Sequence, residues 1–394
     1  MIDFKRETVL CVFLALLIVC PRSAQRAEAW SISGHEIIVS RACRLFPGSW
    51  GDFFRYYEWL LNDTVAYPDT FYKGRDPAES SRHFVDLEIW NESRPETGTL
   101  PQAVETFGKD MSDSIKSADW NRVLLDAGRL AHYVSDICQP YHSTVNYDPA
   151  TKSGIRLHAV LDGALRDHLS EIRLTSSFQT ARIVNFKDHA LFLAKQSNSF
   201  LAEINSTLID QGLPWSSRLT EIIENRTNTA VVATMNVWHT AILASGFSAP
   251  TLPEPKTLKI AARSTLQAID TTHDNVFAFT VTDRLGVKTA SEIRAEVAGI
   301  VLETELHRDL ADPLGSYRTL LPADKLKNLR GNIELGVTAL REGYFSAKLI
   351  VPLRIEEPHI QLDYMIYLAT AAATIMILSF ALLIREYRKQ RQMK

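Results

Sequence analysis

Apolar residues in the first two thirds of the chain recur at three- and four-residue spacing. Segments of this kind are HEIIVSRACRLF, NRVLLDAGRLAHYVSDIC, LHAVLDGALRDHL and TNTAVVATMNVWHTAILAS, and glycine and proline are sparse within them. This periodicity is typical of amphipathic helices that bury one face in a shared core. The sequence therefore predicts an all-α domain over residues 30–248.

The pattern changes after a proline-rich stretch. SAPTLPEPKT, residues 248–257, contains three prolines and predicts a linker. Beyond it, apolar and polar residues alternate in NVFAFTVTD, EIRAEVAGIVLETEL, GNIELGVTAL and YFSAKLIVPLRI, with turn-prone pieces between them. Alternation with a period of two predicts strands. We expect an antiparallel, immunoglobulin-like β-sandwich domain over residues 256–358.

An apolar run near the N-terminus has the features of a secretory signal. A basic region precedes VLCVFLALLIVC, and AEA at residues 27–29 has the small-x-small pattern that signal peptidases cleave. The run is too short to span a bilayer comfortably. We therefore expect residues 1–29 to be a signal peptide and the mature chain to begin at Trp30.

A second apolar run, at residues 364–384, contains no charge and no proline. About 20 apolar residues match the thickness of a hydrocarbon core, so this run predicts a transmembrane helix. Residues 385–394 form a basic tail. Because positive residues favour the cytoplasmic side, we expect a single-pass cell-membrane protein with its N-terminal ectodomain outside and its tail in the cytoplasm.

Charge and cysteine content restrict the function classes. The net charge of −3 argues against a nucleic-acid binder that depends on a broad basic surface. Outside the expected signal only Cys43 and Cys138 remain, and they can form one disulfide or stay as two buried thiols. Glycosylation sequons fit an exported glycoprotein, and they lie at Asn62, Asn91, Asn205 and Asn225.

Histidine and aspartate residues of the helical domain suggest metal chemistry. His132 and Asp136 are four residues apart, as are His158 and Asp162. Side chains at this spacing share a helix face, where an imidazole and a carboxylate can bind one zinc ion. Roughly one such pair is expected by chance in this composition, so the spacing alone does not define a site. The stronger signal is that several such residues follow one another along a single helical domain.

That order resembles a known superfamily. The matching motifs are WSISGH with Trp30 and His35, YPD with Asp69, HFVD with His83, HYVSDICQPYH with His132, Asp136 and His142, and HAVLD with His158 and Asp162. Together they resemble the zinc-dependent phospholipase C and S1/P1 nuclease superfamily. The resemblance covers the helical domain and extends neither to the β-sandwich nor to the membrane segment.

The resemblance implies an all-α fold with three zinc ions in one cleft. The ligand sets it implies are Asp69, His83, His132 and Asp136 for the first ion, His142, His158 and Asp162 for the second, and the terminal amine and carbonyl of Trp30 with His35 and the bridging Asp136 for the third. A zinc-activated water would attack the phosphorus of a phosphodiester. Asp69 would act either as the proton acceptor or purely as a ligand.

Two branches of the superfamily share these metals. The gaps from Asp69 to His83 and from His142 to His158 are short, as in the phospholipase branch, and a membrane tether also favours phospholipase C-like hydrolysis of a phospholipid. The motif HFVDLE and the acid Asp162 instead resemble the nucleases. The alternative is therefore a surface nuclease or 3′-nucleotidase acting on nucleic acid. A third hypothesis is a tethered binding or adhesion protein whose zinc is structural.

Overall fold

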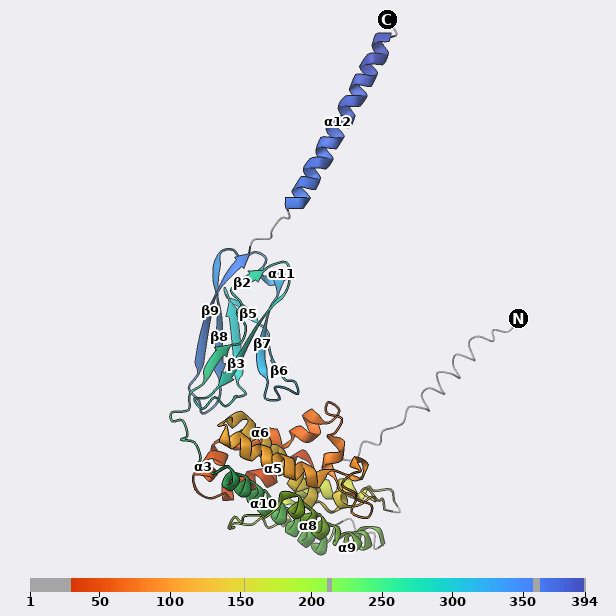
Figure 1. The fold of residues 1–394 in the computed structure, drawn as a ribbon, viewed down its shortest axis with the longest axis vertical. Coiled ribbons are helices and arrows are strands. Elements are labelled where there is room, and N and C mark those ends of the chain that lie inside the picture. The colour runs from red at the N-terminus through yellow and green to blue at the C-terminus, as the bar shows by residue number, and fades with distance from the viewer. Residues whose placement is uncertain (1–29, 152, 211–214, 357–361, 393–394) are drawn as a thin grey trace, which may run out of the picture. The chain divides into compact units, whose positions relative to one another are not determined.

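The computed structural model describes residues 30–151, 153–210, 215–356 and 362–392 (Figure 1). The expected signal peptide lies outside these residues. The chain divides between Leu252 and Pro253 into two compact units. We call the first the helical unit and the second the β unit, and each is described by itself.

The helical unit is built from α-helices joined by short 3₁₀ and π turns, which confirms the helical prediction. The α-helices are α2 (Ile32–Leu45), α3 (Gly48–Tyr56), α4 (Glu58–Val65), α5 (Leu100–Lys116), α6 (Trp120–Cys138), α7 (Leu157–Asp167), α8 (Phe186–Asn198), α9 (Leu201–Asn205) and α10 (Ser217–Ser245). The short turns are η1 (Pro68–Tyr72), η2 (Ser80–His83), η3 (Pro95–Thr97), η4 (Pro140–Ser143), η5 (Leu169–Glu171) and η6 (Ser206–Asp210).

Helix α6 lies in the core of the helical unit. Every residue of α6 from Val123 to Cys138 is buried, as expected for a helix that is covered on all sides. A Cβ at Gly128 would lie 2.1 Å from the Oγ1 of Thr64, so the glycine allows α4 to pack directly on α6. Any functional side chain carried by α6 is therefore held in a rigid, water-poor environment.

The chain turns sharply where α6 ends. Gln139 follows the last residue of the helix, and its side chain accepts a hydrogen bond from the backbone N–H of Tyr141. Pro140 begins η4, where its missing N–H is no loss because the first groups of a helix have no partner within it. The turn places His142, which follows α6, back beside the end of that helix.

The β unit contains two sheets that share one apolar core. The first sheet has the order β1 (Lys259–Ala262), β3 (Asn275–Thr282), β7 (Ser316–Leu321), β6 (Thr304–His307). The second has the order β2 (Ala268–Asp270), β9 (Ala347–Glu356), β8 (Asn332–Leu340), β4 (Glu292–Val297), β5 (Ile300–Leu302). The short helix α11 (Ala323–Leu326) follows β7. Buried residues from both sheets, such as Phe277 and Val337, meet in a single cluster.

One strand pair departs from the predicted antiparallel arrangement. β2 pairs with β9 in parallel, with Ile269 opposite Ile355. Both side chains are buried in the core cluster, so the pair contributes to the same apolar core as the antiparallel strands. The prediction of a purely antiparallel sandwich is therefore wrong at this pair, because the alternation of a three-residue strand does not reveal its neighbour.

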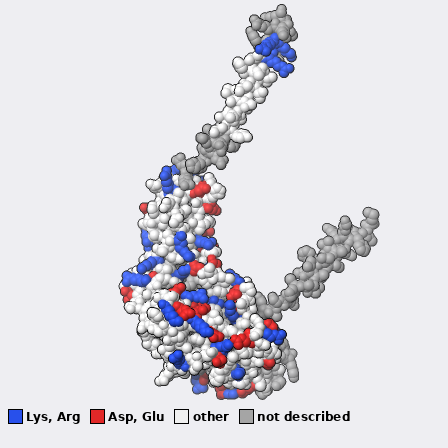
Figure 2. All heavy atoms as spheres, in the orientation of Figure 1, with Lys and Arg blue, Asp and Glu red and all other residues white. Residues whose placement is uncertain are grey.

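The last element is the long helix α12 (Leu362–Gln392). Its segment Ile366–Arg385 has a mean hydropathy of 2.2, and it is the one segment among the described helices long and apolar enough to cross a membrane. Figure 2 shows that the surface of α12 is uncharged along most of its length and basic near its C-terminal end, where Arg385, Arg388 and Lys389 lie. The composition of this helix fits the predicted transmembrane segment, whereas its orientation remains an expectation from the sequence.

Within the described residues, Cys43 and Cys138 are two free, buried thiols. Cys43 lies on α2 and Cys138 is the last residue of α6. Burial raises the pKa of the Cys138 thiol to about 12, so this group stays protonated at neutral pH. Of the two alternatives that the sequence left open, one disulfide or two buried thiols, the structure contains the two buried thiols.

Candidate metal centre

The eight predicted ligand side chains are all buried in the helical unit. They come from six elements: His35 from α2, Asp69 from η1, His83 from η2, His132 and Asp136 from α6, His142 from η4, and His158 and Asp162 from α7. Burying this many titratable groups is unfavourable unless they are paired or bind a cation. Their distances show two neighbouring groups.

The first group surrounds Asp136. Its Oδ2 lies 3.0 Å from Nδ1 of His83 and 3.3 Å from Nε2 of His132, and its Oδ1 lies 3.4 Å from Nε2 of His35. The imidazole of His35 stacks on that of His132, with ring centroids 4.0 Å apart. Asp136 is thus the carboxylate on which the imidazoles of three elements converge.

Asp69 closes the other side of this group. Its Oδ1 lies 3.7 Å from Nδ1 of His83, and its Oδ2 lies 3.8 Å from Nε2 of His132. Two sets of three side chains have one donor atom each within 4.8 Å of one another and could hold a metal ion. These sets are His35, His132, Asp136 and Asp69, His83, His132.

The second group contains His142, His158 and Asp162. Nε2 of His142 lies 3.0 Å from Nε2 of His158, which lies 3.4 Å from Oδ2 of Asp162. Nδ1 of His142 donates to the main-chain oxygen of His83, and Nδ1 of His158 donates to that of Tyr147 at 2.8 Å. In a neutral imidazole the other nitrogen is then an acceptor. Two lone pairs therefore face each other across 3.0 Å, and a cation or a proton is required between them.

Residue 30 lies beside both groups. The indole of Trp30 is fully buried and donates from Nε1 to the main-chain oxygen of Ser135 at 3.0 Å, next to Asp136 on α6. The following N–H, of Ser31, donates to the main-chain oxygen of Asp162 at 3.1 Å. Trp30 is thus fixed between α6 and α7. This position is compatible with the prediction that its main-chain amine and carbonyl bind a zinc ion. The sequence reasoning did not foresee that the indole is itself an anchor.

Atoms without partners indicate what the first group accommodates. Among the described residues, buried atoms of this group that have no hydrogen-bond partner are Nδ1 and Nε2 of His35, Oδ2 of Asp69, Nε2 of His83 and Oδ1 of Asp136. Leaving a buried polar atom unpaired costs about 1–3 kcal/mol. A metal ion would satisfy such atoms, and mixed imidazole and carboxylate donors are those that zinc prefers.

The electrostatics also favour a bound cation. Burial alone would lower the pKa of His83, but the carboxylates of Asp136 and Glu79 outweigh burial and raise that pKa to about 10. Burial raises the pKa of Asp162 well above its usual value, with the nearby Asp136 and Asp69 adding to the effect. Without a metal, protons must therefore supply the positive charge that the cluster lacks. The donor set fits zinc.

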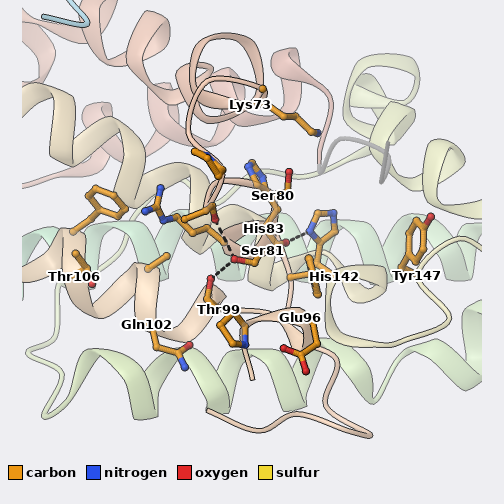
Figure 3. Close-up of a pocket in the computed structure, with 18 of the residues that line it drawn as sticks. Lys73, Ser80, Ser81, His83, Glu96, Thr99, Gln102, Thr106, His142 and Tyr147 are labelled. Atoms are coloured by element: carbon orange, nitrogen blue, oxygen red, sulfur yellow. Dashed lines mark hydrogen bonds between the residues drawn. The ribbon is translucent and has the colours of Figure 1, made fainter. Parts of the chain in front are cut away.

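A pocket of about 910 Å³ opens onto the cluster. His83, His142 and His158 line it. In Figure 3 His83 and His142 lie between Lys73 on one side and Glu96 on the other, and a dashed line marks the bond from His142 to the main chain of His83. The remaining wall combines polar residues such as Ser80, Ser81 and Thr99 with apolar ones such as Phe84 and Phe107. A substrate can therefore reach the imidazoles of both groups from one side.

Sequence reasoning missed two residues that hold ligands in place. Gln139 donates from Nε2 to Oδ1 of Asp162 at 2.9 Å. Glu79 is fully buried, and its Oε1 lies 3.4 Å from Nε2 of His83. Burial alone would raise the pKa of Glu79, but the nearby imidazole of His83, the hydrogen bond from Tyr133 and the charge of Arg129 hold it at about 2. The available signal was the spacing of Glu79 and His83, a carboxylate four residues before a histidine.

No protein-family model and no curated protein sequence matches the chain. Two solved structures with similar chains are alpha-toxins of Clostridium. The alpha-toxin of Clostridium perfringens from an avian strain is 11% identical and covers 83% of this chain and 100% of its own, with a TM-score of 0.42. The alpha-toxin of Clostridium absonum is 13% identical and covers 82% and 96%, also with a TM-score of 0.42. The functional assignment depends on the side chains described above.

Proposed function

We propose that this protein is a zinc-dependent phosphodiesterase that hydrolyses phospholipids in the manner of a phospholipase C, at the outer face of the membrane that α12 spans. The observation that carries the proposal is the convergence of three histidines, His35, His83 and His132, on Asp69 and Asp136, next to an open pocket that His83 lines. A structural zinc site is closed and needs about four ligands, whereas this donor set is larger and faces the pocket. This difference favours catalysis over a purely structural metal.

Each ligand set has a place in this proposal. Asp69, His83, His132 and Asp136 would hold one ion, His142, His158 and Asp162 a second, and His35, Asp136 and the main chain of Trp30 a third. Bound zinc ions of this kind lower the pKa of a bound water toward neutrality and neutralise charge on a phosphate.

The remaining roles belong to side chains at the pocket. Oδ2 of Asp69 has no hydrogen-bond partner among the described residues, and we assign this oxygen as the proton acceptor for the attacking water. Nζ of Lys73 lies 3.4 Å from Oδ1 of Asp69 and lines the pocket, where its charge attracts a phosphate. Water adds to phosphorus, the bond from phosphorus to the diacylglycerol oxygen breaks, and that oxygen takes up a proton.

A phospholipid is favoured over nucleic acid by the aromatic residues of the pocket. Binding of single strands depends on aromatic faces on which bases stack. Among the lining residues, Tyr141 is buried, and Phe107 already stacks on Tyr133 and lies under Arg129. Phe84 is buried as well, which leaves Tyr147 as the one partly exposed aromatic ring of the lining. One such ring is a poor platform for a run of stacked bases. The apolar helix α12 supports the same choice, because it would keep the enzyme at a lipid surface.

A substrate panel tests the proposal. The full chain is purified in detergent, its zinc is counted, and it is offered phosphatidylcholine, other phospholipids, single-stranded nucleic acid and 3′-nucleotides. We expect chelator-sensitive release of a phosphorylated head group from at least one phospholipid. Turnover of nucleic acid alone would assign the chain to the nuclease branch. Bound zinc without turnover of any substrate would favour the tethered binding protein.

A further inference from the structure

A buried carboxylate outside the ligand sets contacts the metal centre. Glu79 immediately precedes η2 and is fully buried. The hydroxyl of Tyr133 donates to its Oε1, Nη1 of Arg82 lies 2.8 Å from Oε2, and Nη2 of Arg129 lies 3.3 Å from Oε2. The guanidinium of Arg129 in turn lies 4.0 Å from the ring centroids of both Tyr72 and Phe107. Glu79 is therefore held from several directions while its Oε1 faces His83.

His83 is oriented differently from the other histidines of the cluster whose hydrogen bonds the structure gives. His132, His142 and His158 each direct Nδ1 at a main-chain oxygen and Nε2 at the cluster. His83 directs Nδ1 at the cluster, 3.0 Å from Oδ2 of Asp136, and Nε2 at Glu79. A carbonyl oxygen can only accept, so it fixes the tautomer of each of the other three rings. For His83 a carboxylate occupies the corresponding place.

We propose that Glu79 is a positioning residue of the metal centre, which accepts the Nε2–H of His83 and so keeps the Nδ1 lone pair directed at the metal. The proposal rests on the proposed function only in that His83 binds a metal. A carboxylate behind a ligating histidine fixes its tautomer and ring orientation and raises its basicity. The present separation of 3.4 Å is longer than an ideal hydrogen bond. A cation at Nδ1 polarises the opposite N–H and favours a shorter contact.

The role is distinct from that of an ordinary buried ion pair in the same unit, which provides a matched control. Asp126 on α6 is also fully buried, accepts from the hydroxyl of Ser114 at 3.1 Å and is paired with Arg122 at 3.0 Å. Its contacts given by the structure include no predicted ligand. Glu79→Gln and Asp126→Asn thus each neutralise one buried, arginine-paired carboxylate, and only the first lies against a ligating imidazole.

The test measures zinc binding in the full chain in detergent. Zinc is titrated against a competing chelator for the wild type, Glu79→Gln and Asp126→Asn, and the visible spectrum of the cobalt-substituted proteins is recorded. For Glu79→Gln we expect one zinc to bind about 10–100-fold more weakly, the change typical of residues that support a ligand. The cobalt bands should shift for this variant. Asp126→Asn should keep the wild-type affinity and spectrum.

A second variant covers the case in which Glu79→Gln does not fold. Glu79→Asp keeps the charge that neutralises Arg82 and Arg129 but withdraws the carboxylate from Nε2 of His83 by one methylene. We expect this variant to fold and to lose zinc affinity in the same direction, by a smaller factor.

Each result decides the proposal. Unchanged affinity and spectrum in the Glu79 variants would overturn it, as would equal losses in Asp126→Asn. A wild type that binds no zinc would overturn both this inference and the proposed function. A wild type that binds zinc but hydrolyses no phosphodiester would remove the proposed function alone, because the effect of Glu79 on zinc affinity would still stand.

Discussion

The helical unit and the β unit use buried polar side chains for different purposes. In the β unit, Asp283 is buried and accepts hydrogen bonds from the backbone N–H groups of Leu285, at 2.8 Å, and Val287, at 3.0 Å. It completes the turn that follows β3. In the helical unit, Asp136 is buried to the same degree, and its neighbours are imidazoles from α2, η2 and α6. The carboxylate of Asp283 thus accepts hydrogen bonds from nearby backbone N–H groups, whereas that of Asp136 faces imidazoles.

This difference separates structural burial from functional burial. A buried polar group that completes a turn adds stability, whereas a cluster of carboxylates and imidazoles with unpaired atoms reduces it unless a ligand is bound. The helical unit maintains such a cluster on the rigid helix α6, and the pocket gives a substrate access to it. The two kinds of burial should therefore respond differently to the same treatment.

Removal of metal should have the largest effect. A chelator should abolish turnover and lower the melting temperature of the helical unit, because the buried carboxylates lose their counter-charge. An ion present at 1,000 times its dissociation constant stabilises the folded state by about 4 kcal/mol. Calorimetry of the full chain, before and after chelation, measures the two transitions. If chelation lowered the melting temperature of the β unit as much as that of the helical unit, the proposed difference between the two units would be wrong.

Substitution of Asp136 should have the next largest effect. Its carboxylate contacts His35, His83 and His132, so Asp136→Asn would weaken the binding of two ions together. We expect turnover to fall by more than the roughly 100-fold that marks the upper range for residues behind a ligand, with the fold kept. Asp162→Asn should do less, because Asp162 belongs to one proposed ion. The comparison requires rates and zinc content for both variants, and near-wild-type values for Asp136→Asn would show that the ligand assignment is wrong.

Extension of the chain before Trp30, the expected mature N-terminus, should have a smaller effect. If two residues, Met-Ala, precede Trp30, its nitrogen becomes an amide without the basic lone pair that zinc requires. We expect the fold to persist, one zinc to be lost and turnover to fall roughly tenfold or more, as for a disturbed ligand. Trp30→Phe in a chain that begins at residue 30 should keep its zinc, while loss of the bond to Ser135 costs about 1 kcal/mol of stability. The test is to determine the N-terminal sequence, zinc content and rate of both chains. Unchanged zinc content in the extended chain would exclude ligation by the amine.

The sequence predicted the helical domain and proposed the ligand set because both are encoded in local order. The apolar periodicity defines α6, and the four-residue spacing puts His132 and Asp136 on one of its faces. The role of Glu79 was not predicted, because its four-residue spacing to His83 lies in an irregular segment, where a side chain has no fixed direction until η2 forms. The parallel pair of β2 and β9 was missed for a related reason. Strand neighbours depend on contacts across more than 80 residues of intervening chain, which local alternation does not record.

The smallest effect on catalysis should come from the buried carboxylate of the β unit. Asp283→Ala leaves the N–H groups of Leu285 and Val287 without their side-chain acceptor, and Val287 is fully buried. An unsatisfied buried donor costs about 1–3 kcal/mol, so the β-unit transition should move to lower temperature. Asp283→Asn keeps one acceptor oxygen and should move it less. Turnover of a soluble phosphodiester should equal that of the wild type at temperatures where the β unit is folded, because every proposed ligand lies in the helical unit. Calorimetry and rates measured on the same samples separate the two effects, and a loss of turnover at such a temperature would mean that the β unit contributes to the site.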